Sequence, residues 1–250
     1  GTWNNVNDNN DLFSGFAWTT HGKHVPSKEY KIRVVADGGN KYRWRNSIDT
    51  VTFAQNAVKL RIAAGGLYTI DVSDSSVDGH PFKFSETSNG IHGGGSSYNT
   101  GVTYLLDGVS VSESTYHNTS NFNAATTRKI QIQTASAKTL YYYCHIHSGM
   151  GGEIDVNALS GNSNFDGAIQ STVSVNDTSG LSLVTYSGSG SDSTAGHGLG
   201  VHPDWIIWKA LDDTFNWDTY FKTVGYQKTL IINSSNGSRN VLQQNPDDLT

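Results

Sequence analysis

Short stretches in which apolar and polar residues alternate are the feature that most restricts the fold of this 250-residue chain. Residues 58–62 and 129–133 alternate strictly, which is typical of strands with one buried and one solvated face. Residues 139–144, Thr-Leu-Tyr-Tyr-Tyr-Cys, are strong strand formers. No stretch has the apolar spacing that a helix requires. The pattern therefore predicts an all-β protein of many short strands joined by tight turns.

The charge balance argues against nucleic-acid binding, because the net charge is -5 and the sequence contains no block of Lys or Arg. The one basic stretch, residues 41–45, alternates and is interpreted as a strand with a solvated face. No apolar run approaches the ~20 residues that span a bilayer, so we expect no membrane insertion. The chain begins with Gly and no apolar signal segment follows, so we expect a processed product or part of a longer chain.

Composition divides the chain into four parts. Residues 1–27 are rich in Asn and Gly without a clear period, and we predict an irregular N-terminal arm that could mediate assembly. Strand patterns follow one another through residues 28–156, which predicts a first β domain. Residues 157–164 are predicted to be a linker, and residues 165–250 a second β domain. Its strands are predicted at residues 168–175, 181–186, 205–209, 217–221 and 230–232.

The single cysteine and the single methionine fall in one short window, with Cys144, His147 and Met150 each separated by two residues. A lone cysteine cannot form an internal disulfide, so it is an inert core residue, a reactive thiol or a ligand. Copper is bound in blue-copper sites by two imidazoles, one thiolate and a weak axial thioether. A short loop after a strand can place three such side chains around one ion, so these neighbours favour a ligand.

This Cys-x2-His-x2-Met loop after a Tyr-rich strand resembles the ligand loop of amicyanin-type cupredoxins. The Gly-His-Pro-Phe segment at residues 79–82 is similar to the strand-edge histidine segment of the same fold. The resemblance implies a cupredoxin-like Greek-key β-sandwich over residues 28–156 with copper as its cofactor. Residues 86–127 make the segment between the ligands longer than in plastocyanin-like proteins. The implied metal ligands are His80 and His147 as imidazoles, Cys144 as thiolate and Met150 as axial thioether.

Structural interpretations of the same residues stay open. Cys144 could be a small core residue, Met150 could pack in a loop, and His80 could cap a turn before a proline. His147 could be an ordinary surface residue, which would leave a cupredoxin fold with an empty site. His145 also neighbours the cysteine, but adjacent side chains of a strand point to opposite faces, so it is less suited as a ligand.

The second domain carries a further resemblance. Residues 165–209 contain a Gly-Ser-rich loop followed by a Gly-His-Gly segment. This succession of motifs is similar to a module of tail and fibre proteins of marine tailed phages, especially cyanophages. Those modules resemble concanavalin-like, lectin-type sandwiches, which are usually longer than residues 165–250. The first domain resembles a module of the same phage proteins. The resemblance implies a second β-sandwich whose completeness is open.

These resemblances imply a structural protein of a virion: a tail fibre, a whisker or a capsid decoration. Its expected partners are other virion proteins, further copies of the chain, with a trimer as one form, and a host surface glycan. We expect no enzymatic activity, because the sequence contains no nucleophile elbow, no phosphate loop and no paired carboxylates with a defined role. Four protein ligands would also leave no open position on the metal for a substrate.

Two other functions remain as alternatives. The first is a periplasmic or extracellular blue-copper electron carrier, which the four ligands alone would support. The second is a glycan-binding lectin acting through aromatic residues of the second domain, although core packing explains such residues equally well. Trp205 and Trp208 are an odd number of positions apart, so only one of them can join a given strand face. The aromatic residues considered are Trp205, Trp208, Trp217, Tyr220 and Phe221.

Overall fold

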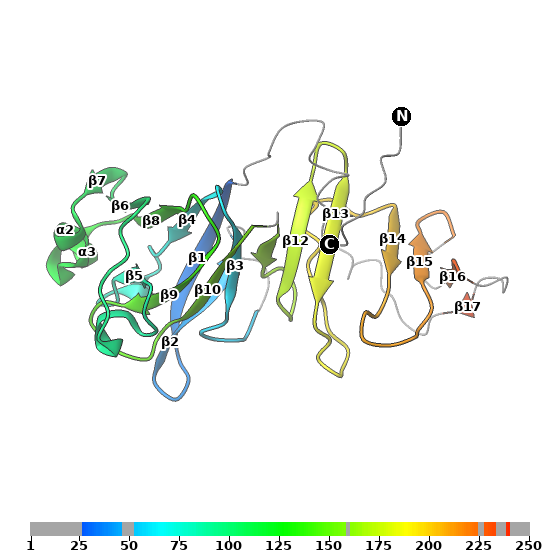
Figure 1. Ribbon diagram of the computed structural model, residues 1–250, viewed down its shortest axis with the longest axis horizontal. Coiled ribbons are helices and arrows are strands. Elements are labelled where there is room, and N and C mark those ends of the chain that lie inside the picture. The colour runs from blue at the N-terminus through cyan, green and yellow to red at the C-terminus, as the bar shows by residue number, and fades with distance from the viewer. Residues whose placement is uncertain (1–26, 47–52, 159–160, 225–227, 234–238, 241–250) are drawn as a thin grey trace. The chain divides into compact units, whose positions relative to one another are not determined.

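The computed structural model describes residues 27–46, 53–158, 161–224, 228–233 and 239–240 (Figure 1). Among these residues strands predominate and the helices are short, which confirms the all-β prediction. The chain forms two compact units, which consist of residues 1–174 with 184–196 and of residues 175–183 with 197–250. Apart from Ser27, the predicted N-terminal arm lies outside the described residues. In the described part of the chain, no helix is long and apolar enough to cross a membrane.

The first sheet of unit 1 has the strand order β2-β1-β4-β8-β6-β7. Its strands are β1 (Ser27–Ala36), β2 (Asn40–Asn46), β4 (Leu67–Asp71), β6 (Val102–Leu106), β7 (Val109–Val111) and β8 (Arg128–Gln133). The β1–β4 pair is parallel, and the remaining pairs are antiparallel. Every second side chain of a strand points into the core, and on β1 these include Tyr30 and Ile32, which are both buried.

The second sheet has the order β3-β10-β9-β5, with β3 and β10 parallel. Its strands are β3 (Leu60–Ala63), β5 (Phe82–Ser85), β9 (Lys138–Cys144) and β10 (Gly152–Asn157). Buried residues of both sheets form one apolar cluster, so the two sheets pack as a sandwich. Short helices lie in the connections, and α2, which packs on α3, contacts β6 (Figure 1). These helices are η1 (Ser75–Val77), η2 (Gly90–Gly93), α2 (Glu113–His117) and α3 (Thr119–Ala124).

The centre of the sandwich is aromatic. Phe82 and Tyr142 stack with ring centroids 5.5 Å apart and planes 16° apart, and Trp44 meets Tyr142 edge-on at 5.1 Å. All three are fully buried, and each buried aromatic ring removes a large apolar area from water. Phe82 and Tyr142 each stand two residues from a predicted metal ligand, so this packing fixes the strands that carry the ligands.

Residues 157–164, predicted as a linker, include a buried strand, β11 (Asn162–Asn164). The backbone carbonyl of Ser163 accepts a hydrogen bond from the Tyr30 hydroxyl at 2.7 Å. Phe165 follows immediately and belongs to the core cluster with 2% of its surface exposed. The polar composition that suggests a linker instead provides hydrogen-bond partners for buried groups of the sandwich.

Replacement of Phe165 by alanine is expected to lower the free energy of unfolding by about 3–5 kcal/mol. Its ring stacks on Trp44 at 6.1 Å and meets Tyr30 at 5.7 Å, so its removal leaves a cavity beneath two buried aromatic rings. Urea denaturation followed by tryptophan fluorescence measures the change. Phe215→Ala is the matched control, because that ring is 66% exposed and its loss should cost little. Equal effects of the two substitutions would contradict the core assignment of Phe165.

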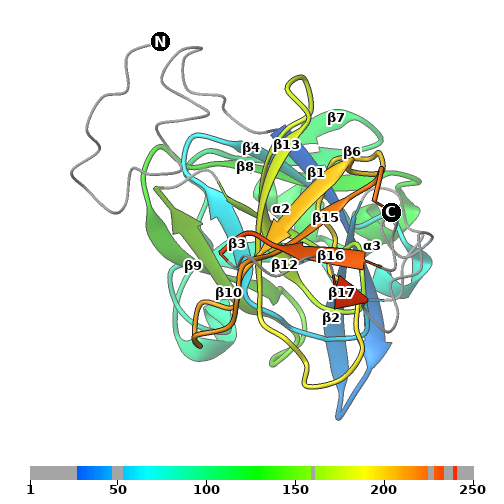
Figure 2. The same ribbon diagram turned by 90° about the vertical axis from the view of Figure 1, so that its right-hand side faces the viewer.

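Two further sheets follow in the chain. The order β11-β12-β13 makes one, and the order β14-β15-β16-β17 makes the other, with three antiparallel pairs. Figure 2 labels three neighbouring strands of the second of these sheets, β15, β16 and β17. The predicted strands overlap the observed ones in all five places. The strands are β12 (Ser171–Asn176), β13 (Leu181–Tyr186), β14 (Trp205–Trp208), β15 (Asp218–Phe221), β16 (Lys228–Ile231) and β17 (Arg239–Asn240).

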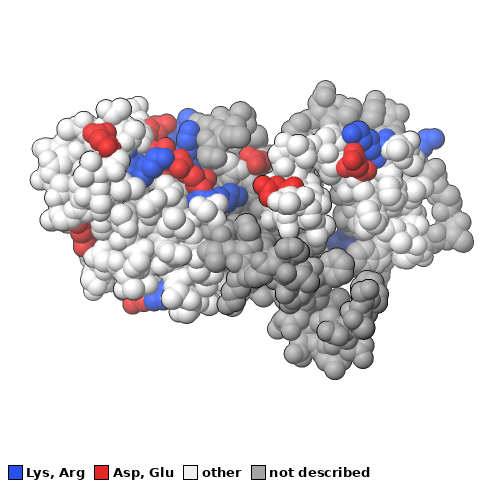
Figure 3. All heavy atoms as spheres, turned by 90° about the horizontal axis from the view of Figure 1, so that it is seen from above, with Lys and Arg blue, Asp and Glu red and all other residues white. Residues whose placement is uncertain are grey.

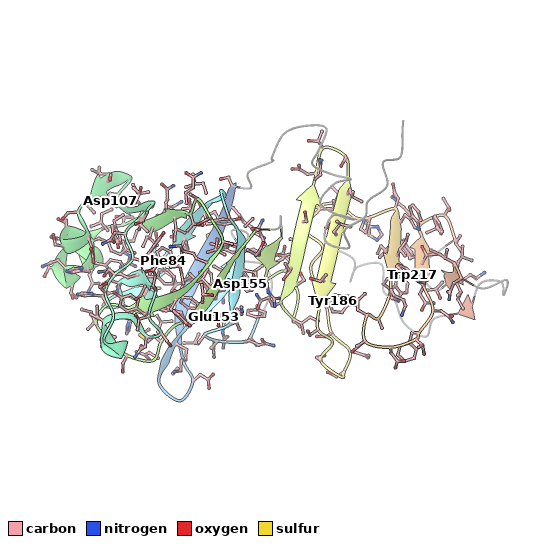
Figure 4. All side chains as sticks on the ribbon, in the orientation of Figure 1. Phe84, Asp107, Glu153, Asp155, Tyr186 and Trp217 are labelled. Carbon is pink, nitrogen blue, oxygen red and sulfur yellow. The ribbon has the colours of Figure 1, made fainter. Side chains whose placement is uncertain are left out.

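Opposite charges lie side by side on the face shown in Figure 3. On β10, Glu153 and Asp155 are two residues apart and therefore share one face (Figure 4). Lys59 pairs with Glu153 at 2.6 Å, and Arg61 lies opposite Asp155 in the β3–β10 register with 3.8 Å between the charged groups. Such exposed pairs contribute about 0–1 kcal/mol each.

Candidate metal centre

Two adjacent strands and one loop bring the predicted ligands to one end of the second sheet. His80 lies two residues before β5, after a turn in which Gly79 has φ +76° and the His80 amide donates to the Val77 carbonyl at 2.9 Å. Cys144 is the last residue of β9 and pairs with Phe82 of β5. His147 stands in the loop that follows. Antiparallel pairing therefore places the end of β9 beside the start of β5.

The thiol of Cys144 and two imidazole rings form a compact triangle of donors. Its Sγ is 3.8 Å from Nδ1 of His80 and 3.8 Å from Nδ1 of His147. The ring centroids of the two histidines are 4.6 Å apart, and the three donor atoms all lie within 4.8 Å of one another. Two imidazoles and one thiolate are the equatorial donors of blue-copper sites, so the residues present fit a copper ion.

Burial raises the pKa of the Cys144 thiol, and this outweighs the opposing effect of hydrogen bonds from the backbone amides of His147 and Ile146. The His147 amide donates to Sγ at 3.4 Å. The thiol therefore keeps its proton at neutral pH in the metal-free protein. A bound cation would reverse this balance, because a coordinating thiol loses its proton outright.

His80 is held as a neutral ring. Burial lowers the pKa of His80, and the nearby ring of His147 lowers it further. The Asn40 amide lies 3.4 Å from Nε2, the ring nitrogen that faces away from the thiol. Because the amide nitrogen is a donor, this contact belongs to the tautomer with its proton on Nδ1, and a ring that coordinates through Nδ1 would need the Asn40 amide turned so that its oxygen accepts from Nε2. The Tyr42 hydroxyl donates to the His80 carbonyl at 2.7 Å, so β2 supports the ligand through two residues.

Met150 is buried at the end of the same loop, with 1% of its surface exposed, and belongs to the core cluster. Its carbonyl accepts a hydrogen bond from the Tyr42 amide at 3.0 Å, which ties the loop to β2. The structure thus places three predicted ligands together. The axial role of Met150 stays a prediction.

Gly151 allows the ligand loop to turn back into β10. A Cβ atom at this position would lie 1.7 Å from the Tyr142 carbonyl oxygen, which no real contact permits. Gly151→Ala is therefore expected to lower the free energy of unfolding by about 1–3 kcal/mol and to weaken metal binding, because the loop must shift. Chemical denaturation and metal titration measure both effects. Gly188→Ala is the control, since a Cβ there meets open space, and equal behaviour of both variants would contradict this account.

The other histidines near the site take different positions. His145 stacks on His117 with ring centroids 3.8 Å apart and planes 11° apart, away from the thiol, as strand alternation predicts. His92 lies with Nε2 3.0 Å from the Cys144 carbonyl oxygen and so contacts the backbone of the ligand strand. Sequence reasoning missed Asn40 and Tyr42, because nothing in the local sequence of β2 indicates that it lies beside His80.

Comparison with known proteins adds two findings. Residues 156–248 match a family described as a domain of unknown function (DUF7483). Among solved structures, a multi-copper oxidase from Pseudomonas Thermotolerans is similar over 53% of this chain and 29% of that chain, with 13% sequence identity and a TM-score of 0.28. No curated protein matches the sequence. The sheet topology and donor-atom distances of this chain itself therefore carry the assignment of the site.

Proposed function

We propose that unit 1 is a cupredoxin-like copper-binding domain that holds one ion with His80, Cys144 and His147, and with Met150 as axial ligand. The observation that carries this proposal is a compact triangle of donor atoms, in which the Cys144 sulfur lies 3.8 Å from an imidazole nitrogen of each histidine. Such a donor set supports a one-electron couple when copper is bound. The protein contributes a prearranged site, in which the β5–β9 pairing, the hydrogen bond from the Tyr42 hydroxyl to the His80 carbonyl and the aromatic core hold the donors in place.

Titration of the metal-free full chain with Cu(II) tests this proposal. We expect one ion per chain and an intense visible absorption from the thiolate–copper interaction. His145→Ala should keep the absorption, because that ring lies against His117 and outside the donor cluster, whereas His80→Ala should lose most of it. Binding without colour, or equal effects of the two histidine substitutions, would contradict the proposed ligand set.

We propose further that the chain is a structural component of a virion, as a tail fibre, a whisker or a capsid decoration, and that it has no enzymatic activity. The resemblance of both domains to phage appendage modules supports this role. In such a protein, a metal that joins the turn at residues 79–82 to the loop at 144–150 would stabilise the folded state. Mass spectrometry of purified particles tests the location, and finding the protein only outside particles would contradict it.

An electron carrier of a bacterial envelope is the second candidate, and the exposure of His147 favours it. Cys144 is fully buried, whereas His147 is exposed at the end of the sandwich. One ligand ring thus reaches the surface where a redox partner could dock. Rapid electron exchange of the copper-loaded protein with small redox dyes would support this role, and slow exchange would leave the structural role.

A glycan-binding role has one supporting observation in the second domain. Trp205 is 55% exposed and stacks on Phe221 with centroids 5.3 Å apart, which gives a flat aromatic surface. Tyr220 is 3% exposed and is a core residue, so the aromatic group divides between surface and interior. A glycan array with the full chain tests this role. Signals that persist in Trp205→Ala would contradict binding at this surface.

A further inference from the structure

Lys83 is a buried lysine on the outer face of the second sheet. Its neighbours Phe82 and Phe84 belong to the core cluster, so alternation directs Lys83 away from the core. Only 1% of its side chain is exposed, because α2 lies over it. Glu113 and His117, one helical turn apart on α2, both face the amine: Glu113 Oε1 forms an ion pair with Nζ, and His117 Nδ1 lies 3.4 Å from it.

The side chain of Asn99 is held beside the same carboxylate. The Tyr98 amide donates to the Phe84 carbonyl at 2.7 Å, so the chain before Asn99 runs along β5. The Asn99 amide nitrogen donates to Glu113 Oε2 at 2.5 Å, and its oxygen accepts from the Tyr104 hydroxyl at 2.7 Å. Glu113 therefore contacts the lysine amine through one oxygen and the asparagine amide through the other.

This arrangement contains every group that an amide exchange requires. Lys83 supplies a nucleophilic amine, Asn99 supplies a carboxamide, and Glu113 can move protons between them. The Tyr104 hydroxyl is placed to stabilise negative charge on the amide oxygen as it develops. Burial lowers the pKa of Lys83, while the interactions with Glu113 oppose this effect. Burial raises the pKa of Glu113, but hydrogen bonds from Lys83, Ser97 and Asn99 outweigh it and bring that pKa to about 2, so the carboxylate holds the lysine proton only briefly and the transfer is slow. The reaction needs to occur once in each molecule, so even a slow step is sufficient when the groups are held together.

We propose that Lys83 and Asn99 form an intramolecular isopeptide bond, with Glu113 as the catalytic acid and base. Glu113 Oε1 takes a proton from the Lys83 ammonium, and the neutral amine attacks Cγ of Asn99 to form the new C–N bond. Glu113 passes this proton to Nδ2 and accepts the second amine proton as the C–Nδ2 bond breaks. Ammonia leaves and carries that last proton away as ammonium. No electrons are gained or lost, and the carboxylate is regenerated.

The cross-link would close the long loop between β5 and β6 covalently. The loop crosses the outer face of the sheet and includes η2, whose His92 contacts the backbone of Cys144. A covalent closure restricts the unfolded chain and thereby stabilises the folded one. The bond is independent of copper, because neither Lys83 nor Asn99 belongs to the donor cluster.

Intact-mass spectrometry of the denatured full chain tests the proposal. The measured mass should fall below the sequence mass by one molecule of ammonia in nearly every chain. Trypsin should no longer cut after Lys83, and a branched peptide should join the segments that contain Lys83 and Asn99. In Glu113→Gln, which keeps a hydrogen-bonding side chain of the same size, the cross-linked fraction should fall at least tenfold.

Two further variants separate chemistry from folding. Asn99→Ala removes the amide while leaving Lys83 and Glu113 paired, and should have the full sequence mass with a cooperative unfolding transition. Lys138→Ala is the matched control, because Lys138 pairs with Glu86 at 2.9 Å on the surface, and it should retain the ammonia loss. A wild-type chain of full sequence mass overturns the proposal. So does an ammonia loss that persists in Lys83→Arg or maps to an unbranched peptide, which indicates cyclisation of an asparagine.

Discussion

Replacement of Cys144 by serine should abolish the intense visible absorption of the copper-loaded protein and lower copper affinity by more than about a hundredfold. The substitution keeps the size of the side chain nearly unchanged in a fully buried position. A serine hydroxyl, however, does not ionise at neutral pH and is a harder donor than a thiolate. The two histidines, with Met150 as a weak axial donor, would then hold the ion without a thiolate.

Optical titration and competition with a chelator measure this loss. Ser148→Ala is the matched control, because Ser148 is exposed in the same loop and should affect neither colour nor affinity. Circular dichroism shows whether the serine variant folds. A folded Cys144→Ser protein that retains the absorption would place the colour on some other group and would exclude Cys144 as the ligand.

Copper affinity should rise by about tenfold for each unit of increasing pH through the neutral range. The affinity rises with pH because Cys144 must lose a proton when copper binds. Burial raises the pKa of this thiol, so the metal-free protein holds the proton, and binding must release it. Each unit of pH makes that release more favourable until the raised thiol pKa is passed, above which the affinity levels off.

His80 adds to this dependence only in acid. Burial and the neighbouring His147 lower its pKa, so the ring is already neutral over the range in which the thiol controls binding. Below that lowered pKa a second proton must leave, and the affinity should fall more steeply. Chelator competition at a series of pH values measures the slope. A flat profile, or an unchanged slope in Cys144→Ser, would contradict control by the thiol.

Much of the fold follows from local patterns. The alternation of residues 129–133 fixes both the strand and its buried face, which β8 confirms. The helices α2 and α3 escaped prediction because each has too few residues for a period to be recognised. Their beginnings did carry a signal, since Ser112 and Asn118 accept hydrogen bonds from the amides three residues later.

The candidate metal ligands could be predicted from the sequence because they include residue types that are rare in this chain. Cys144 and Met150 each occur once, so their spacing with His147 is informative without knowledge of the fold. The supporting contacts are different, because they join residues far apart in the chain. Phe82 and Phe84 face the core, so alternation only places Lys83 on the opposite face, and the position of α2 shows that it is buried there.

The position of β11 determines where this chain can be divided for separate production. A gene fragment that stops at residue 156, where composition suggests a border, would lack both β11 and Phe165. The Tyr30 hydroxyl would lose its acceptor, and the faces of Trp44 and Tyr30 that Phe165 covers would meet solvent. Such a fragment should expose an apolar aromatic surface to solvent and therefore aggregate. A fragment that extends through residue 196 retains β11, Phe165 and the segment 184–196 of the same compact unit, so the metal-binding half should be expressed to that residue.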